Sequence, residues 1–310
     1  MKLVAFVAAV LLGATLPPTP SFAGPTGAWR LQARAQGVVD FTLHYHGDRH
    51  DENWEHGFPI AGSALGLSTA DLRSHGVHRR FNFSPDAGTF ACEGWLSDGA
   101  GGGSFTFAPN PNFVQELAKR GIGAPSEEQQ FRLAFENFSL ATLDEMRADG
   151  YQMPDVDGLI AMIDHGVTSA YIRRLSLAGY RVGTVHELIR LVDHGVTADY
   201  AARLPRLVAK RPSAEDLING VDHGVTLTFA ENMAAAFGRL DLAQDIAMVD
   251  HGVSSDFVAG LRRLGYRPTP DQAISLVDHG VSLNYIERLR SHGYTRLSVD
   301  DLIRLRDSGV

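Results

Sequence analysis

The chain has 310 residues, which at roughly 150 residues per domain suggests about two domains. Apolar residues make up 44% and charged residues 21%, a balance that fits a globular protein and excludes wholesale disorder. The net charge of −8 gives no general attraction to polyanions and disfavours a dedicated nucleic-acid binder. The single Cys excludes an intrachain disulfide, whereas the 13 His call for a search for metal or catalytic sites.

The first 23 residues predict a secretory signal peptide. Met1-Lys2 gives a positive start, residues 3–16 are apolar, and the small-residue site Ser21-Phe22-Ala23 precedes Gly24. The apolar run is shorter than the roughly 20 residues that a membrane-spanning helix needs. We therefore expect a mature chain that begins at Gly24, has no transmembrane segment and is periplasmic or secreted. The excess of Arg over Lys indicates a bacterial protein.

Residues 24–108 predict a small all-β module, either a sandwich or a partly open roll. Phe41, Leu43 and Tyr45 alternate with polar residues, as in a half-buried strand, and similar patterns cover 79–84, 89–96 and 104–107. A short helix is expected at 68–71 and a turn at the Gly-rich stretch 99–103. The buried core of this module is expected to include Cys92 and the three Trp residues: Trp29, Trp54 and Trp95.

The chemical candidate in this module is a group of four histidines. His44 and His46 share the polar face of one strand, and two imidazoles at this spacing can converge on Zn²⁺ or Cu²⁺. His50, Asp51 or His56, in the loop expected to follow, would complete the ligand set. A solvated strand end with a polar hairpin loop explains the same residues without a metal, and the sequence leaves both readings open.

A tetrapeptide repeat organises residues 109–310. Asp-His-Gly-Val occurs at 164–167, 193–196, 222–225, 250–253 and 278–281, and the chain ends on Asp-Ser-Gly-Val at 307–310. Each unit shows two apolar-periodic segments with capping residues, and the register extends back to Asn110. The sequence thus predicts an α+β multidomain protein, in which the β-module (24–108) precedes a right-handed α-solenoid (109–310) of seven two-helix repeats of 28–29 residues.

Local signals mark the helix ends in each unit. In the unit that begins at Thr168, Gly179-Tyr180 ends the first helix, and Thr184 with Glu187 predicts a capping box for the second. The units from Thr197 and Thr226 lack Gly-Tyr, so the stack is expected to bend or expose surface there. Other second helices have caps of the same type at Ser126, Ser213, Asp241, Thr269 and Ser298.

Asp-His-Gly-Val is interpreted as a helix-ending device. Gly195 would be the left-handed residue after the helix, Val196 would pack back, and His194 would be the C-cap. Asp193 is expected to accept hydrogen bonds from the N–H groups that open the next helix. A functional His ladder is disfavoured, because histidines about 10 Å apart cannot share one metal. The structural set is Asp164, His165, Gly166, Asp193, His194, Gly195, Asp222, His223, Gly224, Asp250, His251, Gly252, Asp278, His279 and Gly280.

The units at 167–180 and 298–310 resemble bacterial helical repeats found in exported proteins and attached to membrane metallopeptidases of the β-lactam-sensing antirepressor type. The resemblance covers the repeat region, but the peptidase's His-Glu-x-x-His motif and membrane helices are absent from this sequence. In the stretch that begins His186-Glu187, an Arg stands where the second His would be. The resemblance implies an accessory interaction or sensor role, and no catalytic residue is carried over.

The leading hypothesis is a non-enzymatic exported scaffold that presents its helical repeats to a protein or cell-envelope partner, without nucleic acid. The alternative is a periplasmic sensor that binds a metal or small ligand through the β-module, with Zn or Cu as the only cofactor considered. An envelope hydrolase, the third hypothesis, would need a deep pocket with a convergent acid and base. Partner binding is expected to use arginines of the first helices: Arg173, Arg174, Arg203, Arg206, Arg262, Arg263, Arg288 and Arg290.

Overall fold

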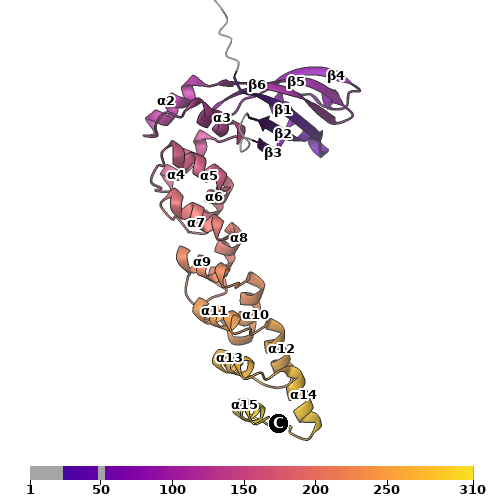
Figure 1. The fold of residues 1–310 in the computed structure, drawn as a ribbon, viewed down its shortest axis with the longest axis vertical. Coiled ribbons are helices and arrows are strands. Elements are labelled where there is room, and N and C mark those ends of the chain that lie inside the picture. Colours follow the sequence, from indigo (N-terminus) through magenta and orange to yellow (C-terminus); the bar gives the residue numbers. More distant parts are fainter. Residues whose placement is uncertain (1–23, 48–52, 310) are drawn as a thin grey trace, which may run out of the picture. The chain divides into compact units, whose positions relative to one another are not determined.

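The computed structural model describes residues 24–47 and 53–309, so the predicted signal peptide and His50 lie outside the described residues. The chain divides into two compact units, Met1–Asn110 and Pro111–Val310. Strands form the first unit and helices the second, which confirms the predicted combination of a β-module and a helical region (Figure 1).

The first unit contains one antiparallel six-stranded sheet with the strand order β3-β2-β1-β6-β5-β4. Consecutive strands pair within each half of the sheet, β1 with β2 and β2 with β3, then β4 with β5 and β5 with β6, and the pairing of β1 with β6 joins the two halves. The strands are β1 (Thr26–Ala33), β2 (Val38–His46), β3 (Asn53–Ala61), β4 (Val77–Phe83), β5 (Gly88–Ser97) and β6 (Ala100–Pro109). The short elements are η1 (Ala35–Gly37), η2 (Gly62–Leu65) and α1 (Thr69–Leu72).

The sheet is curved so that residues from its two edge strands meet. Phe58 of β3 and Phe83 of β4 have ring centroids 5.2 Å apart, and Phe41 of β2 lies 5.6 Å from Phe83. Trp29 of β1 lies 4.9 Å from Phe81 in an edge-to-face arrangement. The core is therefore enclosed by one rolled sheet. The predicted partly open roll agrees with this arrangement, and the predicted sandwich is wrong.

Several local expectations for this unit also need correction. Within the Gly-rich stretch, Gly99 lies in a turn as predicted, but Gly101 to Gly103 belong to strand β6: a Cβ on Gly103 would lie 2.6 Å from the Gly94 Cα, so glycine permits close pairing of β5 with β6. Trp95 points away from the core and is 61% exposed, because it alternates with the buried Cys92, Gly94 and Leu96 along β5. Burial raises the pKa of the Cys92 thiol to about 12, which fits the predicted core role.

The second unit contains 14 α-helices over the residues that the structure describes. The even-numbered helices are α2 (Pro111–Lys119), α4 (Leu140–Ala148), α6 (Ser169–Leu177), α8 (Ala198–Arg203), α10 (Leu227–Phe237), α12 (Ser255–Arg263) and α14 (Leu283–Ser291); α8 continues into η3 (Leu204–Arg206). The odd-numbered helices are α3 (Glu127–Phe135), α5 (Val156–Asp164), α7 (Val185–Asp193), α9 (Ala214–Asp222), α11 (Leu242–Asp250), α13 (Pro270–Asp278) and α15 (Val299–Asp307).

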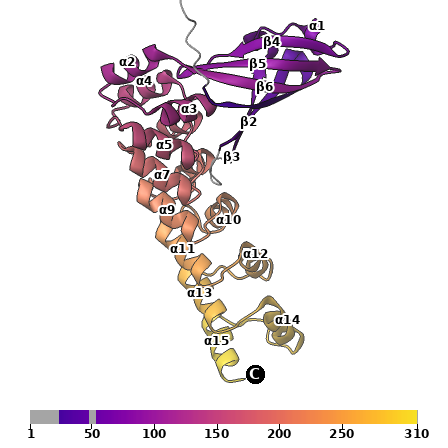
Figure 2. The same cartoon turned by 45° about the horizontal axis from the view of Figure 1, so that its top comes forward.

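Helices of the same parity pack on one another. Contacts join α3 to α5, α5 to α7, α9 to α11, α11 to α13 and α13 to α15, and likewise α4 to α6, α6 to α8, α10 to α12 and α12 to α14. Figures 1 and 2 both show α9, α11, α13 and α15 in one row and α10, α12 and α14 in another. Apolar residues such as Leu188, Leu191 and Ile172 lie buried between the helices.

The helix ends follow the predicted chemistry with one exception. Capping boxes are present at the five other predicted caps, among them Ser126 and Ser213. The Thr184 hydroxyl accepts a hydrogen bond from the Glu187 N–H, but the Glu187 carboxylate is paired with Arg190 instead of closing a box. A competing ion pair one turn along the helix therefore decides the side-chain orientation of Glu187.

Candidate functional sites

The repeated histidines and aspartates form a ladder between successive odd-numbered helices. In each pair, a His Nδ1 at the end of one helix lies 2.7–2.9 Å from the carboxylate at the end of the next. The side chains are about half exposed, for example 41% for His194 and 44% for Asp222. The pairs are His165 with Asp193, His194 with Asp222, His223 with Asp250, His251 with Asp278 and His279 with Asp307.

The Asp-His-Gly-Val tetrapeptide ends α5, α7, α9, α11 and α13 in a Schellman motif. Gly195 has a φ of 74°, its N–H donates to Val192 O at 2.8 Å, and the Val196 N–H donates to Leu191 O at 2.8 Å. His194 is the C-cap, as predicted. The Gly and His roles in the helix-ending interpretation are therefore confirmed.

The predicted role of the aspartate is wrong. The Tyr200 N–H, near the start of the next helix, donates to the Thr197 hydroxyl, so this cap needs no carboxylate from Asp193. Asp193 instead accepts from His165, which lies 28 residues earlier in the chain. The aspartate thus connects its helix to the preceding odd-numbered helix. Among the described residues, no group of three or more His, Cys, Asp or Glu side chains is arranged to hold a metal ion.

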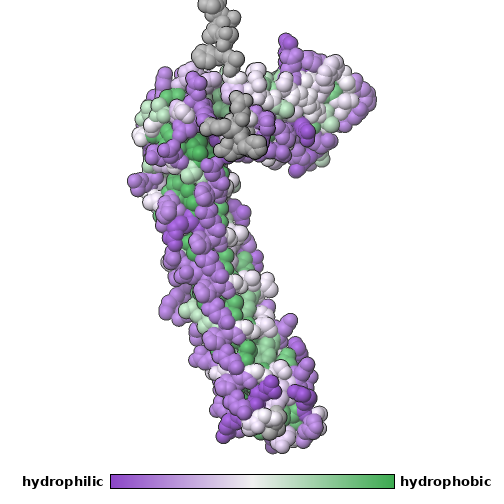
Figure 3. All heavy atoms as spheres, in the orientation of Figure 1, coloured by the Kyte–Doolittle hydropathy of each residue, from purple (hydrophilic) through white to green (hydrophobic). Residues whose placement is uncertain are grey.

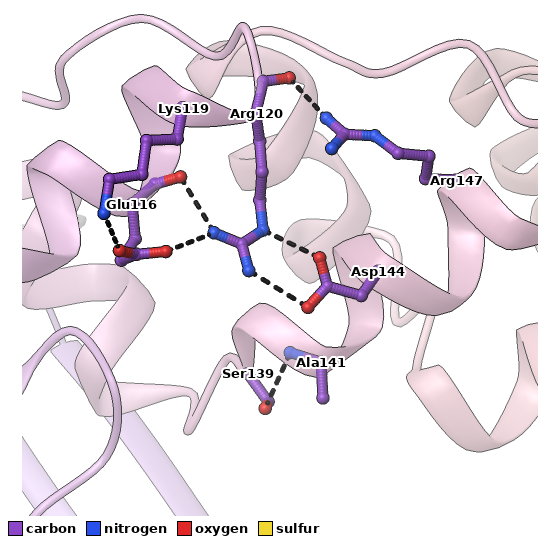
Figure 4. A network of polar contacts seen from close by, with 7 residues as sticks. All are labelled: Glu116, Lys119, Arg120, Ser139, Ala141, Asp144 and Arg147. Atoms are coloured by element: carbon purple, nitrogen blue, oxygen red, sulfur yellow. Dashed lines mark hydrogen bonds and ion pairs between the residues drawn. The ribbon is translucent and has the colours of Figure 1, made fainter.

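At the start of the helical unit, arginines rather than histidines pair with carboxylates of the following helices. Arg120 donates to both carboxylate oxygens of Asp144, at 2.9 and 3.0 Å, and to Glu116 at 2.7 Å (Figure 4). The Arg120 hydrogen bonds lower the pKa of the Asp144 carboxyl. Arg132 reaches Asp164 at 2.9 Å, so the first aspartate of the repeated motif also has a partner. Polar contacts between neighbouring helices of the helical unit thus extend beyond the histidine motif.

The eight arginines proposed for partner binding divide into two groups. Arg173 pairs with Glu145 and Arg203 with Glu231, while Arg262 donates to Ala236 O and Arg290 to Leu264 O. These four side chains therefore make contacts within the helical unit. The side chains of the other four make no hydrogen bond or ion pair with any described residue; these are Arg174, Arg206, Arg263 and Arg288.

Two of the unpaired arginines line a pocket between α6 and α8. The pocket has a volume of about 550 Å³ and is lined by Arg174, Leu177, Ala178, Ala198, Ala202, Pro205, Arg206 and Arg211. Leu177 is 82% exposed. The pocket lies where the unit from Thr197 lacks Gly-Tyr, because Pro205 helps to end α8 early and the chain continues through η3. The sequence irregularity therefore corresponds to an exposed surface, as expected.

The structure does not bring His44, His46 and His56 together, and His50 of the predicted ligand set lies outside the described residues. His44 and His46 share one face of β2, with His44 Nδ1 3.3 Å from Glu55 and His46 bonded to Asn53. His56 belongs to strand β3 rather than a loop, and it pairs with Leu43 on the opposite face of the sheet. The prediction that His56 completes the set is wrong, because a shift of one residue along a strand reverses the face. The alternation of Trp54, His56 and Phe58 was the signal for this strand.

A pocket lies beside His44. The Nε2 atom of His44 is buried and has no hydrogen-bond partner among the described residues. The pocket has a volume of about 440 Å³ and is lined by His44, Tyr45, Trp54 and Glu55, together with other residues of β1 to β3. Glu55 can hold the Nδ1–H of His44, which leaves Nε2 able to accept a hydrogen bond.

The middle of the helical unit buries a carboxyl and a phenol hydroxyl that the sequence did not predict: Asp245 and Tyr200. Asp245 is 1% exposed, its Oδ1 makes no hydrogen bond to any described residue, and burial raises the pKa of its carboxyl to about 6. The Tyr200 hydroxyl is likewise buried and unpartnered, and burial followed by the charge of Asp245 raises the pKa of Tyr200 to about 12. A Cβ on Gly220 would lie 2.5 Å from this hydroxyl, so the glycine makes room for it.

The repeat register contained the signal for Asp245. This residue is the fourth of α11, and the fourth residue of five other odd-numbered helices is a fully buried apolar side chain: Leu159, Leu188, Leu217, Ala273 and Leu302. An acid at this position therefore marks a departure from the common packing.

Comparisons with family models, with curated proteins and with solved structures find no match for the chain. Within residues 24–47 and 53–309, no helix combines the length and apolar character needed to cross a membrane.

Proposed function

We propose that the protein is a non-enzymatic, exported interaction scaffold. In this proposal the helices form a right-handed α-solenoid of seven two-helix repeats, each 28–29 residues long, which presents an extended surface to a protein or cell-envelope partner. The observation that carries the proposal is the His and Asp ladder, because it joins successive odd-numbered helices in a uniform way, as a repeat scaffold requires.

Partner binding is assigned to the four arginines that make no contacts within the unit. An arginine already paired with a neighbouring repeat must give up that contact before it binds a partner, whereas an unpaired guanidinium keeps all five N–H donors. The proposed surface therefore includes Arg174, Arg206, Arg263 and Arg288, and it excludes Arg173, Arg203, Arg262 and Arg290.

Affinity capture from an envelope extract tests this function. The mature chain serves as bait beside a variant with the four unpaired arginines changed to Glu and a control with His44→Ala. We expect the wild-type and His44→Ala baits to recover the same partner and the four-arginine variant to lose it. Loss with His44→Ala, or equal recovery by all three baits, would contradict the proposal. Circular dichroism of each bait establishes that it is folded.

Export is tested separately. Expression of the full chain in a bacterium, followed by fractionation and N-terminal sequencing, is expected to yield a periplasmic or secreted product that begins at Gly24. A cytoplasmic product that retains residues 1–23 would refute this part of the proposal.

A second candidate function is a periplasmic sensor that binds a small ligand or a metal at the β-unit. The buried Nε2 of His44, which has no hydrogen-bond partner among the described residues, and the pocket that His44 lines favour it. Titration with Zn²⁺ and Cu²⁺, followed by calorimetry, tests the metal version with His44→Ala and His46→Ala. Stoichiometric binding that both variants abolish would support the sensor, and the absence of binding would remove its metal form.

A further inference from the structure

We propose, building on the function above, that the pocket between α6 and α8 is the primary docking point and that it binds an acidic peptide segment carrying an aliphatic or aromatic side chain. The pocket brings three guanidinium groups together with an exposed leucine and a floor of small residues. This combination fits a protein segment in which acidic and apolar side chains stand side by side.

The charge of the pocket is unbalanced. Arg174, Arg206 and Arg211 line it, and no acidic side chain does. Arg174 and Arg206 have no ion-pair partner among the described residues. A guanidinium group can bind a carboxylate through two parallel hydrogen bonds, so Arg174 and Arg206 are suited to bind Asp or Glu side chains of a partner.

The third guanidinium is held in place before any partner binds. Arg211 donates from Nη2 to Ala178 O, and its Cζ lies 4.6 Å from the centroid of the Tyr180 ring. Only one of its five N–H donors is used in that hydrogen bond. Such preorganisation lowers the entropy cost of binding, because the side chain is already ordered.

Leu177 supplies an apolar contact that the fold itself does not require. It is the ninth residue after the N-cap Thr168. The ninth residue after the N-cap of other even-numbered helices is small or polar: Ala148, Arg206, Ala235, Arg263 and Ser291. Leu177 is 82% exposed, so its departure from the repeat adds nothing to the core. An exposed apolar residue beside a pocket lined by Ala198, Ala202 and Pro205 can contact an apolar side chain of a partner.

The surroundings favour a peptide over a phosphate-rich ligand. Residues 167–310 carry 17 basic and 17 acidic side chains, so the helical region provides no extended positive field for a nucleic acid or an anionic membrane. Figure 3 shows apolar surface interspersed with polar surface along the helical unit, a mixture typical of protein interfaces. The local cluster of arginines therefore acts at short range, together with the apolar contact.

Fluorescence anisotropy of the full mature chain tests the proposal. The probe is a short labelled peptide in which Glu alternates with Leu, and the control probe has Lys in place of Glu. The pocket variants are Leu177→Ser and the double variant Arg174→Glu with Arg206→Glu. The matched control is Arg267→Glu with Arg296→Glu, which reverses two exposed arginines of the helical unit outside both the pocket and the proposed binding surface. All variants are first compared by circular dichroism.

We expect the acidic probe to bind the wild type, the double pocket variant to weaken binding by about tenfold or more, and Leu177→Ser to weaken it by about threefold. The matched control is expected to stay within about twofold of the wild type. Equal binding of the Lys probe, an equal effect of the matched control, or displacement of the peptide by inorganic phosphate or phosphatidylglycerol vesicles would each overturn the assignment.

The two proposals fail in different ways. If the pocket variants bind the probe like the wild type while the four-arginine bait still loses its envelope partner, the pocket is the wrong docking point and the scaffold function stands. If the mature chain recovers no partner under any condition, the scaffold function itself fails, whatever the peptide result.

Discussion

The buried carboxyl of Asp245 leads to the sharpest stability prediction. Replacement by Leu restores the residue type that α5, α7, α9 and α15 place at the same position, and Asp245→Asn removes the charge while keeping the shape. Both changes are expected to stabilise the helical unit at neutral pH. Burial raises the pKa of the Asp245 carboxyl, and no neighbouring cation offsets the cost of holding its negative charge in the buried site.

The size of the effect follows from the two pKa values. A carboxyl with a pKa of 3.8 in the unfolded chain and about 6 in the folded unit differs by roughly two units, which corresponds to about 3 kcal/mol. Since the folded unit holds the proton more tightly, this loss of unfolding free energy is absent at a pH below the pKa of the carboxyl in the unfolded chain. It grows as the pH rises from about 4 to 6 and is complete above the folded pKa. Asp245→Leu adds a gain from apolar burial.

Urea unfolding of the mature chain at pH 4 and pH 7 measures the effect. All three Trp residues lie in the first unit, so Trp fluorescence follows that unit while far-ultraviolet circular dichroism follows the helices. Glu287→Gln, at an exposed position of α14, is the matched control. The difference between variant and wild type isolates Asp245 from the other titrating carboxyls.

We expect Asp245→Asn to raise the free energy of unfolding of the helical unit by about 3 kcal/mol at pH 7 and by much less at pH 4. Asp245→Leu is expected to show the same difference between the two pH values and an additional gain from apolar burial at both. Trp fluorescence is expected to show no change. A gain that is equal at the two pH values, or a loss at pH 7, would refute the reasoning, since either result means that the Asp245 carboxylate has compensating partners.

Three further predictions concern the packing of the helices. Gly195→Ala is expected to cost about 1 kcal/mol of unfolding free energy, because its φ of 74° disfavours a Cβ; no loss in urea unfolding would argue against the left-handed cap. A double-mutant cycle of His194→Ala and Asp222→Ala is expected to show a coupling of about 0.5 kcal/mol, as for other half-exposed pairs, and zero coupling would deny the ladder a stabilising role. Tyr180→Phe should cost about 1 kcal/mol, because its hydroxyl donates to Pro212 O at 2.9 Å, whereas Tyr200→Phe should cost little; equal costs would contradict these contacts.

Much of the local structure of the helical unit could be predicted from short stretches of sequence. The capping residue Ser213, the left-handed Gly195 and the apolar period between them act within about ten residues, so their effects do not depend on distant parts of the chain. The 29-residue repeat also indicated where packing would change, and the pocket beside Pro205 lies at such a place.

Local patterns misled wherever the partner of a side chain is distant. Asp193 is suited to a nearby cap by its chemistry, but its partner is His165 of the previous odd-numbered helix. In the same way, the choice between free and paired arginines depends on residues such as Glu145, which lies 28 positions before Arg173. No local rule connects residues at these separations.

The sequence by itself determined the two-part organisation, the helix ends and the strand alternation, because backbone preferences and capping hydrogen bonds are local. The tertiary structure decided which polar groups meet. It put His56 on the face of the sheet opposite His44, left Arg174 unpaired and buried Asp245 without a partner for its Oδ1 within the described chain. Strand register and helix packing set these outcomes, since a shift of one residue in a strand or one turn in a helix exchanges a buried side chain for an exposed one.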